Sequence, residues 1–126
     1  MRCKLTSMTV AAAIRVTSAD EARVIEHAAA FARQHSEPCF VISVVPSLPY
    51  GGGDEEIVRA NMEAILREKC APVMQEGDDV PQTLLTVARG FGVRTLFLKR
   101  GSTVERLLTL HPPFDVVVVG GEAGAG

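Results

Sequence analysis

The sequence lacks the long apolar segment, the cysteine spacing and the charge excess that define several common protein classes. No uninterrupted apolar stretch approaches the ~20 residues that a membrane-spanning helix needs, and residues 1–8 contain no apolar block typical of a signal peptide. The three cysteines, Cys3, Cys39 and Cys70, are widely spaced, which argues against a disulfide framework and favours incidental thiols in a reducing cytoplasm. A net charge of −2 indicates no general nucleic-acid surface. We therefore expect a cytoplasmic protein with no nucleic-acid partner and no membrane insertion.

Signatures of catalysis and of metal binding are missing as well. The sequence contains no P-loop, no G-x-G-x-x-G and no recognisable catalytic triad. The three histidines have no partner at metal-ligand spacing, and no paired carboxylates or activated nucleophile follow a predicted strand. These absences disfavour an enzyme and predict no metal site.

Apolar runs and helical periodicity alternate along the chain. With 126 residues, 47% of them hydrophobic and 22% charged, the composition is typical of one globular domain, which we place at residues 9–120 with loose termini at 1–8 and 121–126. Strands are predicted at 9–16, 40–45, 72–77, 95–98 and 115–120, and helices at 18–36, 54–71, 79–92 and 103–110. The clearest strands are apolar on both faces, which indicates a parallel sheet between two helical layers. The expected fold class is an α/β three-layer sandwich.

Polar residues gather where two of these strands end. In an open α/β sheet, ligands bind beyond the carboxyl ends of the strands, and glycine and cationic side chains there favour a phosphate. If the first and fourth strands are neighbours, six candidate binding residues converge on one crevice. They are Thr17, Ser18, Lys99, Arg100, Gly101 and Ser102.

A purely structural role also explains the two serines, and we prefer it to a role in both capping and anion binding. Ser18 with Glu21, and Ser102 with Glu105, match the S-x-x-E capping box, in which the side chains satisfy free backbone N–H groups at a helix start. Both alternatives stay open from the residues alone. The place of Arg15 also stays open, because it could face the crevice or pair with an acid on a sheet face.

Two further loops carry local signals. Asp79 is predicted to cap the helix that follows it. Gly51–Gly53 form either a mobile flap or, as we prefer, a solvated linker that ends in a helix cap at Asp54.

The order of strands and helices over residues 9–119 resembles the universal stress protein family, and the last third of the chain matches it best. GDDVPQTLLTVARGFGVRTLFL (77–98) is similar to the family's helix, Ala-Arg, Gly-Val and apolar strand, and GSTVERLLTLHPPFDVVVV (101–119) is similar to its closing Gly-Ser, helix, proline and valine-rich strand. The sensor domain of potassium-regulating histidine kinases is similar too. The resemblance implies a five-stranded parallel sheet in the order 3-2-1-4-5 with helices on both faces. It also implies ATP or AMP binding, as in many members, and a homodimer joined through the last strand, here Val116, Val117, Val118 and Val119.

The chain departs from the family's nucleotide motif, which is Gly, two residues, Gly, nine residues, then Gly with Ser or Thr. Gly101 and Ser102 match the last pair, but Ala88 and Phe91 stand at the positions of the first two glycines. Thr17 stands where many nucleotide-binding members have an acid. We therefore expect a dimeric stress-response signalling or regulatory module with degenerate, at most weak ATP or AMP binding. The alternative is a protein-interaction domain that binds no nucleotide, related to sensor-kinase or transporter regulatory domains and engaging a protein signalling partner. A nucleotide hydrolase is less favoured.

Overall fold

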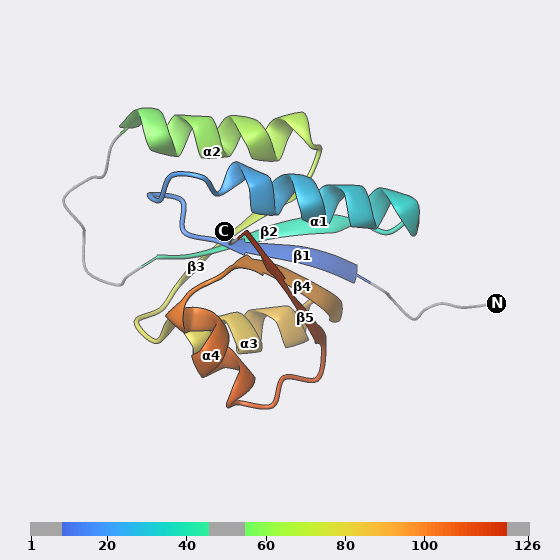
Figure 1. Cartoon of the computed structure of the whole chain (residues 1–126), viewed down its shortest axis with the longest axis vertical. Helices are drawn as coiled ribbons and strands as arrows, with labels where there is room; N and C mark the ends of the chain where they lie inside the picture. Colours follow the sequence, from blue (N-terminus) through green and yellow to red (C-terminus); the bar gives the residue numbers. More distant parts are fainter. Residues whose placement is uncertain (1–8, 46–54, 121–126) are drawn as a thin grey trace.

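Strands and helices alternate from one end of the described chain to the other (Figure 1). A computed structural model describes residues 9–45 and 55–120. The elements are β1 (Thr9–Ile14), α1 (Ala22–Gln34), β2 (Cys39–Val45), α2 (Glu55–Arg67), β3 (Ala71–Glu76), α3 (Val80–Gly90), β4 (Val93–Lys99), α4 (Ser102–Leu108) and β5 (Asp115–Val119). This order confirms the α/β class.

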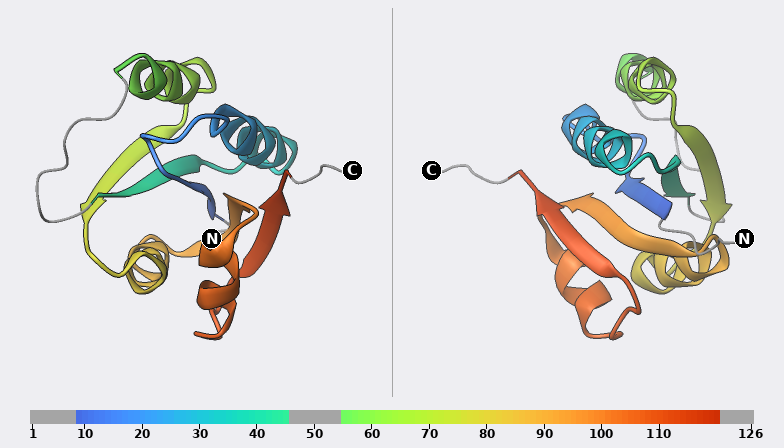
Figure 2. Two further views of the ribbon diagram at one scale, coloured as in Figure 1. Left: turned by 60° about the vertical axis from the view of Figure 1, so that its left-hand side comes forward. Right: turned by 90° about the vertical axis from the view of Figure 1, so that its right-hand side faces the viewer.

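The strands form one parallel sheet in the order β3-β2-β1-β4-β5. Helices α1 and α2 cover one face, and α3 and α4 cover the other (Figures 1 and 2). The predicted three layers and the strand order are confirmed. Because β1 lies at the centre, with Ala12 opposite Val41 of β2 and Phe97 of β4, the turns that follow β1 and β4 lie side by side.

The sequence of strand β1 explains why this strand lies at the centre of the sheet. Val10, Ala12 and Ile14 pack in the core beneath α1 and α2, whereas Ala11 and Ala13 pack in the core beneath α3 and α4. All six residues of the strand are buried, as the uninterrupted apolar run predicts for a strand covered on both faces.

Several element boundaries differ from the prediction. Strand β1 ends at Ile14, and α1 begins at Ala22 instead of residue 18. The reason is local: the Ser18 N–H donates to the Arg15 carbonyl at 2.8 Å, closing a turn, and Asp20 has a φ of 67°, which no right-handed helix can contain. Strand β3 is an edge strand with mostly exposed side chains, which accounts for its weak apolar signal.

Helix α3 spans Val80–Gly90, within the predicted range of 79–92, and its first cap is the predicted one. The Asp79 carboxylate accepts a hydrogen bond from the Gln82 N–H at 3.2 Å, which confirms the cap. Gly92, just beyond the helix, has a φ of 71°, a conformation that favours glycine at a helix end.

Some predictions concern residues outside the described ranges: the two termini, the Gly51–Gly53 loop and the Asp54 cap. Within the described ranges, no helix combines the length and the apolar content needed to cross a membrane.

Candidate functional site

A pocket of about 270 Å³ lies where β1 and β4 end, at the edge of the sheet that binds ligands in open α/β folds. Part of the pocket lining is apolar and comes from the ends of β1, β2 and β4 and from the first turns of α3. These side chains are Ala13, Ile14, Val44, Val80, Leu84 and Leu98. The remaining lining comes from the two turns: Arg15, Ser18, Glu21, Lys99, Arg100, Gly101, Ser102 and Thr103.

The structure brings together all the predicted site residues except Thr17. Ser18 comes from the turn after β1, and Lys99, Arg100, Gly101 and Ser102 come from the connection between β4 and α4. Thr17 is a central residue of the turn that joins Arg15 to Ser18, and it does not line the pocket.

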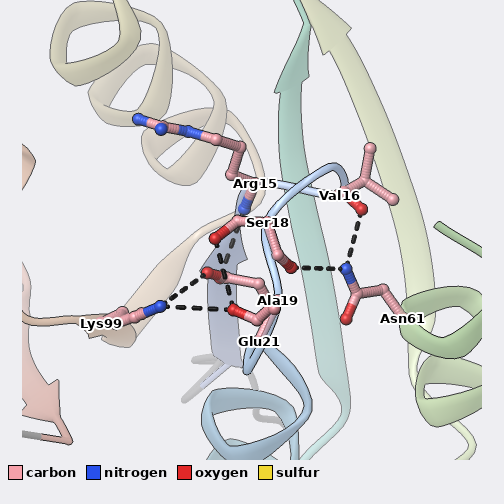
Figure 3. Close-up of polar contacts among 7 residues, drawn as sticks. All are labelled: Arg15, Val16, Ser18, Ala19, Glu21, Asn61 and Lys99. Carbon is pink, nitrogen blue, oxygen red and sulfur yellow. Dashed lines mark hydrogen bonds and ion pairs between the residues drawn. The ribbon is translucent and has the colours of Figure 1, made fainter. Parts of the chain in front are cut away.

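A buried carboxylate, Glu21, organises the wall of this pocket (Figure 3). Its Oε1 accepts a hydrogen bond from the backbone N–H of Arg15 at 3.3 Å. Its Oε2 lies 3.7 Å from Nζ of Lys99, and the side chain of Glu21 is only 5% exposed against 43% for Lys99. The same Nζ donates to the Ala19 carbonyl at 3.3 Å. Lys99 therefore ties the end of β4 to the loop between β1 and α1.

The electrostatics of Glu21 are set by competing effects. Burial raises the pKa of the Glu21 carboxyl above its usual value of 4.5, because the charged form loses hydration. The Arg15 N–H, the charge of Lys99 and the Ser18 hydroxyl act in the opposite direction without cancelling that effect. The pocket wall thus contains an acid that takes up a proton more readily than an exposed glutamate.

Asn61, on α2, holds the same loop from the other side. Its Nδ2 donates to the Val16 carbonyl at 2.7 Å and to the Ser18 carbonyl at 2.9 Å (Figure 3). Asn61 is 3% exposed, so both amide hydrogens satisfy carbonyls that have little access to water. The loop that delivers Ser18 and Glu21 to the pocket is fixed by this contact.

Neither predicted capping box forms. Helix α1 begins after Glu21 and helix α4 begins after Gly101, and neither start has a side-chain cap. The Glu21 carboxylate reaches back past Ser18 to the Arg15 N–H, because the turn after β1 delays the helix. The serines are therefore not occupied as caps, and both line the pocket.

The sequence itself matches no family model and no curated protein, but solved structures share its architecture. A protein of the universal stress protein family from Burkholderia pseudomallei superposes with a TM-score of 0.69 over 89% of this chain and 95% of its own, at 23% sequence identity. A universal stress protein from Archaeoglobus fulgidus superposes with a TM-score of 0.63 over 88% of this chain and 92% of its own, at 20% sequence identity. A structure of the universal stress protein from Archaeoglobus fulgidus in complex with dAMP superposes with a TM-score of 0.63 over 91% of this chain and 98% of its own, at 19% sequence identity. The chain has the universal stress protein fold.

On this universal stress protein fold, the connection between β4 and α4 is short. Only Arg100 and Gly101 separate the two elements. Ala88 is buried inside α3, and Phe91, at the end of α3, packs its ring 5.1 Å from that of Phe40. The two positions where glycines were sought therefore lie before β4 and outside the pocket lining, so they do not contribute to a phosphate-binding loop.

Three features of the site were not predicted from the sequence. Glu21 was assigned only to a cap, and the position of Arg15 was left open; the structure places both in the pocket lining. The apolar wall from α3, Val80 and Leu84, was also missed, although their spacing of four puts them on one helix face. Among residues 9–45 and 55–120, no three His, Cys, Asp or Glu side chains are grouped so that they could hold a metal ion.

Proposed function

We propose that this protein is a stress-protein-like regulatory module that binds a small adenine nucleotide weakly in the pocket between β1 and β4. The observation that carries the proposal is the mixed lining of the pocket: six apolar residues line it together with the cations Arg15, Lys99 and Arg100 and with hydroxyl groups. Such a cavity suits a ligand with a flat apolar end and an anionic end. The dAMP in the Archaeoglobus fulgidus complex belongs to this chemical class.

The size of the site favours a monophosphate over a triphosphate. A volume of about 270 Å³ lies at the lower limit of ligand pockets, which span roughly 300–1,000 Å³. The connection through Arg100 and Gly101 offers few backbone N–H groups to a polyphosphate. Glu21 also forms an ion pair with Lys99, and its carboxylate repels an anion nearby. We therefore expect weak affinity for nucleotides and expect AMP to bind at least as well as ATP.

Calorimetric titration with ATP, AMP and inorganic phosphate, each with and without Mg²⁺, tests the proposal. The informative variant is Arg100→Ala, which removes a guanidinium from the pocket lining; the backbone N–H of Arg100, which donates to Val119 at 3.2 Å, is retained. Loss of one charge-assisted contact should weaken AMP binding by about 1.5–3 kcal/mol.

Arg89→Ala is the matched control, because it removes the same charge from an exposed position on α3 outside the pocket lining. AMP affinity should be unchanged in this variant. Equal affinity in the parent protein and Arg100→Ala would place the nucleotide elsewhere. No heat with any ligand would favour the alternative function, a protein-interaction module.

We also propose that two copies pair through β5. This strand is at the edge of the sheet, and its Val118 is 43% exposed. An unpaired apolar edge strand favours pairing with another strand, and pairing with its own copy gives a two-fold dimer. Val118→Lys should convert a dimer to a monomer in light scattering. Leu66→Lys, at a 70% exposed position on α2, should leave the mass unchanged. A parent protein that is monomeric at every concentration would contradict this assembly.

A further inference from the structure

Two thiols that are distant in the sequence meet at the start of neighbouring strands. Cys39 is the first residue of β2, and Cys70 immediately precedes β3. Phe40 lies opposite Ala71 in the first residue pair of β2 and β3. Cys39 and Cys70 each come one residue earlier, so they also lie opposite one another. The side chain of Cys70 belongs to the core beneath α1 and α2, and that of Cys39 packs against the same core. They therefore point to the same face of the sheet.

The backbone spacing suits a covalent link. Neighbouring strands lie about 4.8 Å apart, and disulfides join Cα atoms that are roughly 4.4–6.8 Å apart. Strained or exposed disulfides are the readily reduced ones, and half-buried Cys39 leaves this link within reach of a reductant.

The surroundings shift the pKa values of the two thiols in opposite directions. The hydrogen bond from the Cys39 thiol lowers the pKa of Cys70, and the guanidinium of Arg33 acts in the same direction, whereas burial and the Glu68 carboxylate oppose it. The pKa of Cys39 is raised, chiefly by its hydrogen bond to Cys70 and by burial. The thiolate is the reactive form of cysteine, so the pair reacts once one sulfur ionises. The directions of the two pKa shifts favour Cys70 as that sulfur, and the single variants below test the order.

Access to the pair is narrow. Cys70 is 6% exposed, and Cys39 is half-buried. Hydrogen peroxide is among the smallest oxidants of thiols, so it reaches such a position most readily. The chemistry that fits the site is therefore oxidation by hydrogen peroxide.

We propose that Cys39 and Cys70 form a peroxide-sensitive dithiol site that closes to an intramolecular disulfide and reopens on reduction. The Cys70 thiolate attacks one oxygen of hydrogen peroxide, the O–O bond breaks, and Cys70 becomes a sulfenic acid while hydroxide leaves. The Cys39 thiol loses its proton to that hydroxide, and its sulfur attacks Sγ of Cys70. The S–S bond forms as the S–O bond breaks, and the second hydroxide takes up the proton that Cys70 first released. Two thiols are oxidised by two electrons, and one peroxide is reduced to two waters.

The test uses the full chain with Cys3→Ser, so that only the proposed pair can react. After treatment with hydrogen peroxide, free thiols are blocked with N-ethylmaleimide under denaturing conditions and the protein is analysed by mass spectrometry. We expect the intact mass to fall by two hydrogen atoms. Proteolysis should give a cross-linked fragment that contains both Cys39 and Cys70. Incubation with reduced glutathione should restore two thiols that N-ethylmaleimide can block.

Single variants in the same background separate the roles. Cys39→Ser should trap Cys70 as a sulfenic acid that reacts with dimedone, whereas Cys70→Ser should leave Cys39 largely unreacted in the same time. The proposal is overturned if both thiols remain blockable after peroxide, if Cys70 proceeds to sulfinic acid in the presence of Cys39, or if the link forms only between molecules. A link that resists glutathione would also overturn it, because the site would then be a permanent cross-link.

Discussion

Asn61 is the residue through which helix α2 positions the loop between β1 and α1, and its replacement gives the sharpest test of how the pocket is built. Its two amide hydrogens bind the carbonyls of Val16 and Ser18 at 2.7 and 2.9 Å. Asn61→Ala removes both hydrogen bonds and leaves one well-buried and one partly buried carbonyl without a partner. We expect the free energy of unfolding to fall by about 2–4 kcal/mol, since an unsatisfied buried polar group costs roughly 1–3 kcal/mol. The higher helix propensity of alanine offsets only about 0.5 kcal/mol.

The assay is thermal and urea unfolding of the parent protein and the variants. For a chain of 126 residues, an unfolding entropy of about 2.1 cal/mol/K per residue converts the loss to a fall in Tm of about 8–15 °C. Glu63→Ala is the control, because Glu63 is exposed on the same helix; its effect should stay within about 0.5 kcal/mol.

Asn61→Asp supplies a second, independent comparison. Aspartate has nearly the same shape, but its carboxylate only accepts hydrogen bonds and would face two carbonyl oxygens. At neutral pH this variant should be less stable than Asn61→Ala, and it should recover partly at acidic pH, where a protonated carboxyl can donate one hydrogen bond. If Asn61→Ala unfolds within 0.5 kcal/mol of the parent, or if Asn61→Asp is as stable as the parent at neutral pH, the two hydrogen bonds do not hold the loop and the reasoning is wrong.

Two further predictions concern the stability of the fold. Because the pKa of Glu21 is raised in the folded state, its contribution is most favourable below the unfolded value of 4.5 and is lost as the pH rises through the folded pKa. Urea unfolding between pH 4 and 8 should therefore show Glu21→Gln gaining stability relative to the parent as the pH rises; a difference that does not vary with pH would refute the assignment. Gly77→Ala should destabilise the protein by about 1–3 kcal/mol, since a Cβ there would collide with the side chain of Thr83, and Thr83→Ala should recover most of the loss. Gly90→Ala, which meets no atom within 4 Å, should be neutral or stabilising by up to about 1 kcal/mol; equal losses at the two glycines would show that packing is not the cause.

Much of the fold could be predicted because its signals are local. The alanine-rich run of β1, the cap at Asp79 and the glycine after α3 each determine their own structure within a few residues. The strand order could not be worked out from the same residues, because apolar runs do not say which strands are neighbours; it came from the family resemblance. Strand β3 gave a weak signal for a physical reason, since an exposed edge strand needs no apolar pattern.

The site was harder to predict because its decisive contacts join distant residues. Asn61 binds carbonyls 43 and 45 positions away, and Lys99 binds Ala19 across 80 positions. The S-x-x-E pattern at Ser18 and Glu21 is local and suggested a cap, but the turn at Arg15 placed a different N–H within reach of the carboxylate. The cysteine pair shows the same limit, since only the pairing of β2 with β3 brings Cys39 and Cys70 together.

The position of Glu21 explains why a pocket lined by three cations need not bind an anion tightly. Lys99 is already paired with the Glu21 carboxylate at 3.7 Å and with the Ala19 carbonyl at 3.3 Å, so its ammonium group has two acceptors before a ligand enters. An incoming phosphate would have to compete for Lys99 and would approach a carboxylate that has little hydration to lose. The cations left to attract a ligand are Arg15, which follows β1, and Arg100, which lies between β4 and α4. The same ion pair also joins β4 to the loop after β1, so the feature that weakens anion binding is one that holds the walls of the pocket together.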